Sequence, residues 1–134
     1  MSRMIFVNLP VKDLSRSIAF FKDLGFAFNE QFTNDQAGYM IVNDQAAVML
    51  VTEPFFDTFS DKTIADTATH VEVQNAVSAA SREEVDAFVE KAIAGGARSA
   101  KPANDEGFMY SRGFQDPDGH LSDIVWMDPS ALEG

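Results

Sequence analysis

The side chains of this sequence that could do chemistry are mainly carboxylates, and Asp123 is the most informative of them. It is followed by Ile124, Val125 and Trp126 in a predicted strand. A carboxylate in such a strand is unexpected unless it faces water or a cavity. If Asp123 faces a cavity, it is the best single candidate for a polar contact with a ligand or for a catalytic general base.

The other ionisable residues have structural explanations. His70 and Glu72 lie two positions apart on one predicted strand, where a surface or dimer contact is favoured over a His/Glu pair with a chemical role. The run Asp116-Pro117-Asp118-Gly119 has the composition of a turn, because proline restricts φ and glycine accepts a positive φ. Its two carboxylates are expected to bond to their own backbone. His120 follows the turn and is expected to be structural or to lie at the rim of a site.

Several kinds of site are excluded by the residues that the chain lacks. There is no cysteine, which excludes disulfides, thiolate metal sites and cysteine nucleophiles. Gly95-Gly96 follows a predicted helix rather than preceding one, so it indicates a helix end and not a phosphate loop. The sequence also has no Ser-His-Asp order with a nucleophile elbow.

The composition is typical of a folded, acidic protein. Apolar residues make up 46% of the 134 residues, and twelve of the residues are Phe. The net charge of −11 and the pI of about 4.3 argue against nucleic acid and anionic membranes as partners, because phosphate binding requires clustered basic residues. Neither a signal peptide nor an apolar run of about 20 residues is present, so we expect a cytoplasmic protein.

The first half of the chain is predicted to be β-α-β-β-β. A strand over residues 4–9 is expected to end at Pro10, and Asp13 is a suitable N-cap for the helix that follows. Gly25 is expected to close this helix. Three further strands are predicted at residues 26–32, 38–42 and 46–52.

The second half is predicted to repeat this order after a crossover at about 54–68, which is expected to be helical from residue 60 or 61. Ser81 and Glu84 form a capping box at the start of its helix. Its strands are predicted at residues 69–79, 97–101, 107–115 and 121–127. The repeat is supported by Asp13 and Ser81, which lie 68 positions apart, and by Gly38-Tyr39-Met40 and Gly107-Phe108-Met109, which lie 69 apart.

Several local motifs occur in the order of one known family. They are the opening stretch at residues 7–17 with Phe-Phe at 20–21 and Leu-Gly-Phe at 24–26, the late stretch at 114–120, and the intervening stretches at 53–56 and 81–85. Together they resemble the glyoxalase/bleomycin-resistance/dioxygenase (vicinal-oxygen-chelate) superfamily, and within it the lactoylglutathione-lyase-like or extradiol-dioxygenase-like subgroup.

This resemblance implies an α+β fold in a single domain over residues 1–134. Two tandem βαβββ modules, at about 1–53 and 69–134, would form a cup-shaped, mostly antiparallel half-barrel.

The resemblance also implies where a metal would be held. Enzymatic members of the family bind a divalent metal with four side chains, two from each module, and the matching positions here are Phe6, Met49, Asn75 and Asp123. Phe6 cannot bind a metal, and Met49 offers only a soft thioether, whereas hard cations require oxygen or imidazole ligands. We therefore predict no metal and no other cofactor.

The resemblance leaves three functional readings. In the first, the cup binds a small, mostly apolar or aromatic molecule, and Phe6, Met49, Asn75, Tyr110, Arg112 and Trp126 contact it. The alternative is a divalent-metal-dependent lyase or dioxygenase, with ligands drawn from His70, Glu72, Asn75, Asp123 and His120. A third reading is a structural or regulatory dimer.

A homodimer is expected from the fold implied by the resemblance. The contiguous aromatic side chains of Phe55, Phe56 and Phe59 are a candidate contact surface. The alternative is that these three side chains pack beneath the crossover.

Overall fold

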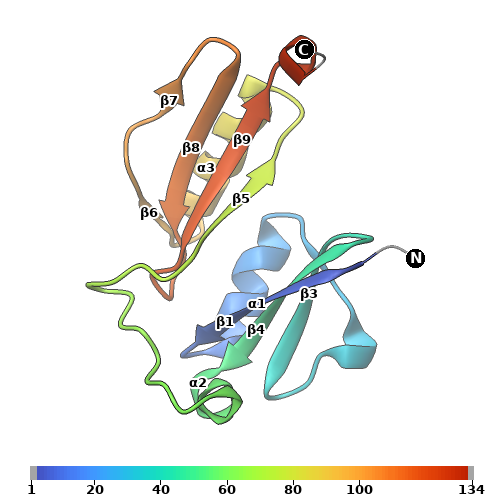
Figure 1. The fold of residues 1–134 in the computed structure, drawn as a ribbon, viewed down its shortest axis with the longest axis vertical. Helices are drawn as coiled ribbons and strands as arrows, with labels where there is room; N and C mark the ends of the chain where they lie inside the picture. The colour runs from blue at the N-terminus through green and yellow to red at the C-terminus, as the bar shows by residue number, and fades with distance from the viewer. Residues whose placement is uncertain (1–2, 133–134) are drawn as a thin grey trace. The chain divides into compact units, whose positions relative to one another are not determined.

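The computed structural model describes residues 3–132 and divides the chain into two compact units, Met1–Ala65 and Asp66–Gly134. Each unit has a parallel strand pair extended by antiparallel strands, with one long helix after its first strand (Figure 1). The fold class is therefore mixed α+β, and each sheet is open, as predicted. None of the helices in the described part of the chain is long and apolar enough to cross a membrane.

The first unit follows the predicted β-α-β-β-β order. Its sheet has the strand order β1-β4-β3-β2, in which β1 is parallel to β4 and the other neighbours are antiparallel. Leu50, at the centre of β4, is fully buried. The elements are β1 (Ile5–Val11), α1 (Leu14–Asp23), β2 (Ala27–Phe28), β3 (Ala37–Asn43) and β4 (Ala46–Thr52).

The ends of α1 are set by the residues that the sequence indicated. The Asp13 side chain accepts a hydrogen bond from the backbone N–H of Arg16 at 3.1 Å, which satisfies one of the free donors of the first turn. Gly25 follows the helix with a φ of 103°, a conformation that an L side chain rarely adopts. Local side-chain chemistry is thus sufficient to define this helix.

Two predicted boundaries in the first unit are wrong. Pro10 lies within β1 rather than ending it, and this is tolerated because β1 is at the edge of its sheet, where proline need not donate a ladder hydrogen bond. The strand predicted over residues 26–32 is reduced to β2, and Glu30–Phe32 is instead a 3-10 turn. Asn29 starts that turn by accepting a hydrogen bond from the N–H of Gln31.

The crossover is helical earlier than predicted. Helix α2 (Glu53–Phe56) and the 3-10 turn η2 (Asp57–Phe59) directly follow β4, and no helix begins at residue 60 or 61. Pro54 lies in the first turn of α2, where its missing N–H and restricted φ favour helix initiation. The rings of Phe55 and Phe56 lie 5.3 and 5.6 Å from that of Phe59, which is itself half exposed.

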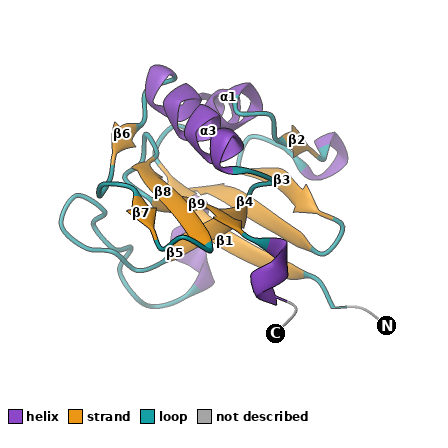
Figure 2. Ribbon diagram, turned by 90° about the horizontal axis from the view of Figure 1, so that it is seen from above, coloured by secondary structure: helices purple, strands orange, loops and turns teal. Residues whose placement is uncertain are grey.

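The second unit repeats the plan with one additional short strand. Its sheet has the order β5-β9-β8-β6, with β5 parallel to β9, and β7 also pairs with β8. Figure 2 shows α3 lying over one face of this sheet. The elements are β5 (Gln74–Ser78), α3 (Arg82–Ala94), β6 (Arg98–Ser99), β7 (Asn104–Asp105), β8 (Met109–Gln115), β9 (Leu121–Met127) and the 3-10 turn η3 (Pro129–Leu132).

The predicted strand over residues 69–79 is shorter in the structure. The N–H groups of Thr69 and His70 both bond to the carbonyl of Asp66, at 3.1 and 2.8 Å, so this part of the segment forms a turn. Only Gln74–Ser78 finds a strand partner, in β9. The alternation of polar and apolar residues in the sequence could not show which of these residues pair with a neighbouring strand.

The predicted N-cap Ser81 of α3 is confirmed, whereas Glu84 bonds one residue before the position that a capping box requires. Ser81 accepts a hydrogen bond from the N–H of Glu84 at 3.1 Å, and the Glu84 carboxylate reaches back to the N–H of Ala80. We expect Ser81→Ala to lower the free energy of unfolding by about 1 kcal/mol. Urea denaturation followed by the fluorescence of Trp126, the single tryptophan of the chain, measures this. The matched control Ser78→Ala, at an exposed serine of β5, should change it by less than about 0.5 kcal/mol.

Candidate functional site

The sheet of the second unit has two chemically different faces. Phe114 on β8 and Ile124 on β9 are 1% and 2% exposed, and the Phe114 ring lies 6.2 Å from that of Phe88 on α3. Side chains alternate along a strand, so Gly113 and Asp123, which are paired across β8 and β9, lie on the opposite face. That face carries the candidate site.

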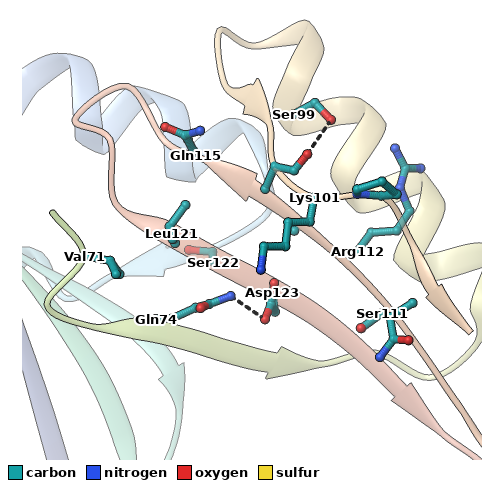
Figure 3. A pocket seen from close by; sticks show the side chains of 14 residues that line it. Val71, Gln74, Ser99, Lys101, Ser111, Arg112, Gln115, Leu121, Ser122 and Asp123 are labelled. Carbon is teal, nitrogen blue, oxygen red and sulfur yellow. Dashed lines mark hydrogen bonds between the residues drawn. The ribbon is translucent and has the colours of Figure 1, made fainter. Parts of the chain in front are cut away.

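An open pocket of about 740 Å³ lies on the face away from α3. Its volume is within the range of about 300–1,000 Å³ that is usual for small-molecule sites. Figure 3 shows the strands β5, β8 and β9 beneath it and the segment between β6 and β7 at its edge. It is lined by Val71, Gln74, Ser99, Ala100, Lys101, Pro102, Asn104, Ser111, Arg112, Gly113, Gln115, Leu121, Ser122 and Asp123.

Asp123 is half-buried in this pocket and is held by a neighbour on β5. The amide nitrogen of Gln74 donates a hydrogen bond of 2.8 Å to Oδ2 of Asp123 (Figure 3). The second carboxylate oxygen lies over Gly113, where a Cβ atom would be only 2.5 Å from Oδ1. Glycine is thus required at this position for the carboxylate to keep its place.

Lys101 supplies a cationic group to the same pocket. It belongs to the segment between β6 and β7, and its side chain extends over the pocket towards Gln74 and Asp123 (Figure 3). Within residues 3–132 no hydrogen bond or ion pair involves its ammonium group. The pocket therefore contains a cation and a carboxylate that are not paired with each other.

The apolar part of the lining is formed by Val71, Pro102 and Leu121. Val71 is 62% exposed, so its side chain offers apolar surface to a molecule in the pocket. The site thus combines apolar side chains with amide, hydroxyl, ammonium and carboxylate groups. This combination suits a ligand that has both an apolar body and polar substituents.

Tyr110 and Arg112 were expected to contact a ligand in the cup, but the structure directs both side chains to α3. The Tyr110 hydroxyl donates to Asp86 at 2.6 Å, and this bond lowers the pKa of Asp86. The Arg112 guanidinium bonds to Glu90 at 2.8 Å and to Asp86 at 3.2 Å. Arg112 borders the pocket, but its charged end points away from it (Figure 3). The error came from strand parity, because both residues share the face of Phe114.

Trp126 was also expected in the cup and lies on the same face as Tyr110. The Arg82 guanidinium is centred 5.1 Å from the Trp126 ring and 5.2 Å from the Tyr110 ring. Arg82 is also paired in a bidentate manner with Asp105 on β7, and this pairing lowers the pKa of Asp105 to about 2. These contacts connect the start of α3 to β7, so the role of Trp126 here is packing.

Phe6 and Met49 lie in the first unit, on the face of its sheet away from α1. A Cβ on Gly38 would lie 3.1 Å from Ile18 of α1, so the alternating residue Tyr39 points to the other face. Tyr39 is paired with Met49, and its ring lies 5.7 Å from that of Phe6. The two predicted positions therefore share one face with an aromatic neighbour.

Asn75 is displaced by one residue from the position that the repeat requires. Phe6 lies seven residues before the cap Asp13, and the residue seven before the cap Ser81 is Gln74. Gln74 faces the pocket, whereas Asn75 pairs with Ser122 on the alternate face. The spacing of the two helix caps was the signal in the sequence that could have identified Gln74.

The four positions do not fit a divalent metal. Phe6 has no atom that can bind a metal, and Met49 has only a thioether. Oδ2 of Asp123 already accepts a hydrogen bond from the Gln74 amide nitrogen. No group of three or more His, Cys, Asp or Glu side chains that could hold a metal occurs among the described residues 3–132. His70 is exposed, and its Nδ1 lies 2.7 Å from the Thr69 hydroxyl.

In the turn at residues 116–119, the expected bonding of a carboxylate to its own backbone is confirmed for Asp116. Oδ1 of Asp116 accepts hydrogen bonds of 2.9 Å from the N–H groups of both Asp118 and His120. Thr67 donates its hydroxyl to the carbonyl of Asp118, which attaches the start of the unit to this turn. His120 is 7% exposed and is a structural residue of the turn.

Burial raises the pKa of Asp116 from 3.8 to about 6, against the opposing effects of the His120 charge and the two N–H donors. Between these two pH values the unfolded chain releases its proton before the folded chain does. The stability contribution of Asp116 is therefore complete below pH 3.8 and is lost as the pH rises to about 6.

We expect Asp116→Asn to gain in stability relative to the wild type by up to about 3 kcal/mol between pH 4 and pH 6, with a constant difference above that range. Asparagine keeps an acceptor oxygen for the two N–H groups but carries no charge. Urea denaturation at a series of pH values measures the difference, and one that does not vary between pH 4 and 7 contradicts the prediction. Asp44→Asn, at an exposed turn residue, is the control.

Solved structures with the same fold support the assignment of the architecture. A protein known as SA1046 from S. aureus is 26% identical, with a TM-score of 0.80 and coverage of 94% of both chains. A glyoxalase/bleomycin resistance protein/dioxygenase family enzyme from Burkholderia phytofirmans is 18% identical, with a TM-score of 0.78 and coverage of 94% and 99%. The fosfomycin resistance protein FosX from Listeria monocytogenes is 19% identical, with a TM-score of 0.66 and coverage of 94% and 91%.

The sequence itself matches the model of one protein family. No match was found among curated proteins. The model of the Glyoxalase/Bleomycin resistance protein/Dioxygenase superfamily matches residues 3–124, which is most of the chain. The chain belongs to the glyoxalase/bleomycin resistance protein/dioxygenase superfamily.

Proposed function

We propose that this protein binds a small organic molecule in the pocket of its second unit without the help of a metal ion. The observation that carries the proposal is the hydrogen bond between Gln74 and Asp123. Asp123 is at one of the positions where the family resemblance implies a metal ligand, and here it is held by an amide in a pocket that also has apolar lining residues. A ligand would thus contact the hydrogen-bond acceptor of Asp123, at a position where metal-dependent relatives would hold a metal cation.

Asp123 has the central role in this proposal. It is half-buried, and only one of its oxygens is engaged by Gln74. The other can accept a hydrogen bond from a ligand, and from the same position it could take a proton from one. The metal-dependent alternative finds no support in the side chains at the four positions.

The proposal is tested by titrating ¹⁵N-labelled protein with neutral probes that include indole, benzamide and cyclohexanol. The protein is first treated with EDTA, and its metal content is determined by elemental analysis. We expect saturable shifts of the Gly113 and Asp123 amide signals in the metal-free protein. The variant Asp123→Asn should alter the response to benzamide, whereas Asp44→Asn should not.

Two outcomes would contradict the proposal. Shifts of these amide signals that require added Zn²⁺, Ni²⁺, Fe²⁺ or Mn²⁺ would establish a metal site. They would favour the alternative function of a metal-dependent lyase or dioxygenase. Absence of any saturable shift at the pocket would show that this face does not bind small molecules. The homodimer stays a prediction, and sedimentation of the same sample tests it.

A further inference from the structure

The cationic groups near the pocket differ in whether they are already neutralised. The Arg112 guanidinium is paired with Asp86 and Glu90. The Lys101 ammonium has no such partner within residues 3–132, although the chain carries a net charge of −11. In an acidic protein, an unpaired ammonium group that extends over a pocket attracts an anionic group of a ligand to that place.

The carboxylate of the pocket is also only partly satisfied. A carboxylate can accept about four hydrogen bonds, and within residues 3–132 only the amide of Gln74 bonds to Asp123. Oδ1 lies close over the backbone of Gly113, and no hydrogen bond to it occurs among residues 3–132. A ligand ammonium or N–H group could therefore bond to this oxygen without displacing Gln74.

The two opposite charges are close enough to line one pocket but do not form an ion pair. A purely anionic ligand would pair with Lys101 but would be repelled by Asp123. A purely cationic ligand would pair with Asp123 but would be repelled by Lys101. A ligand that carries both charges satisfies both groups. The apolar side chains of the lining, Val71, Pro102 and Leu121, would contact its uncharged part.

We propose that the ligand of this pocket is a zwitterion with an apolar body, of the amino-acid class, whose anionic group is bound by Lys101 and whose ammonium group is bound by Asp123. The inference rests on the proposed function, because it names the ligand class of the same pocket. It assigns Lys101 and Asp123 as the residues that determine specificity.

The test is an NMR titration of the ¹⁵N-labelled protein with four compounds that share one ring and chain. They are phenylalanine, 3-phenylpropionate, phenethylamine and the neutral 3-phenylpropanamide. We expect phenylalanine to bind at least about tenfold more tightly than each of the other three, as one charge-assisted hydrogen bond would give. Raising the salt concentration should reduce this preference, because screening weakens charge interactions at a partly exposed site.

Variants identify the residues responsible for the preference. Lys101→Met should remove the preference for phenylalanine over phenethylamine, and Lys101→Arg should restore part of it. Asp123→Asn should remove the preference for phenylalanine over 3-phenylpropionate. The controls Lys91→Met and Asp44→Asn remove the same charges at exposed positions on α3 and on the turn between β3 and β4, and they should leave all four affinities unchanged.

The failure of this inference differs from the failure of the proposed function. The proposal of a zwitterionic ligand fails if 3-phenylpropanamide binds the pocket as tightly as phenylalanine. It also fails if Lys101→Met keeps the preference for phenylalanine over phenethylamine. In both cases the proposal of small-molecule binding still holds. If neither these four compounds nor the neutral probes shift the Gly113 and Asp123 signals, the proposed function itself fails.

Discussion

Replacing Phe114 with alanine is expected to lower the free energy of unfolding of the second unit by about 3–5 kcal/mol. Phe114 is 1% exposed, lies on β8 at the centre of the sheet and packs against Phe88 of α3. Truncation removes the transfer free energy of the ring and leaves a cavity between helix and sheet that rigid neighbours cannot fill. A loss of this size is a large part of the total stability of a small domain.

The measurement is urea denaturation followed by the fluorescence of Trp126, which lies in the same unit. Phe108→Ala is the matched control, because Phe108 is 50% exposed and precedes the same strand. We expect the control to change the free energy of unfolding by less than about 1 kcal/mol. Equal losses in the two variants would show that Phe114 is not in the core of this unit.

Replacing Gly113 with valine is expected to abolish binding of the neutral and zwitterionic probes at the pocket. A Cβ atom at this position would lie 2.5 Å from Oδ1 of Asp123 and 3.4 Å from the Cβ of Ala100. The carboxylate must therefore move, which breaks its hydrogen bond with Gln74, and the branched side chain also occupies pocket volume. Overpacking of this kind typically costs a further 1–3 kcal/mol of stability, by order of magnitude.

Loss of binding and loss of folding are separated by two measurements on the same variant. Trp126 fluorescence reports whether the unit remains folded, and the NMR titration reports binding. Gly113→Ala has the same clash with a smaller volume, so we expect weakened rather than abolished binding. Tight binding by a folded Gly113→Val protein would show that neither the carboxylate position nor the pocket volume matters for the ligand.

The side chains at the positions of the family's metal ligands give these predictions their functional meaning. Family members share the fold, but chemistry depends on the side chains at a few positions. In this chain those positions hold Phe6, Met49, Gln74 and Asp123, of which only the last has a strong ligand for a hard cation. Binding by ordinary hydrogen bonds and apolar contact is the chemistry that this set can support.

Local signals in the sequence were reliable where short-range geometry decides the structure. Asp13 and Ser81 cap their helices as their side-chain chemistry predicted, and residues 121–127 form β9 without any change of boundary. Asp116 bonds to the backbone of its own turn. Each of these features depends on atoms only a few residues apart, so the sequence contains all the information that they require.

Features that depend on distant partners were predicted less well. Whether residues 69–73 join a strand depends on where the parallel strand β9 begins, and the acceptance of Pro10 depends on β1 being at a sheet edge. Arg112 was assigned to the wrong face because an error of one residue reverses the side of every side chain in a strand. Its carboxylate partners on α3 could not be identified from spacing alone.

The sequence by itself determined the family, the repeated order of elements and the weakness of the metal-ligand set, because these depend on residue types and their spacing. Only the tertiary structure decided that Gln74 holds Asp123, that Gly113 makes room for the carboxylate and that Lys101 extends over the same pocket. These residues come from three strands and a loop of the second unit. The pairing register that brings them together is a property of the whole sheet, and no local segment of the chain specifies it.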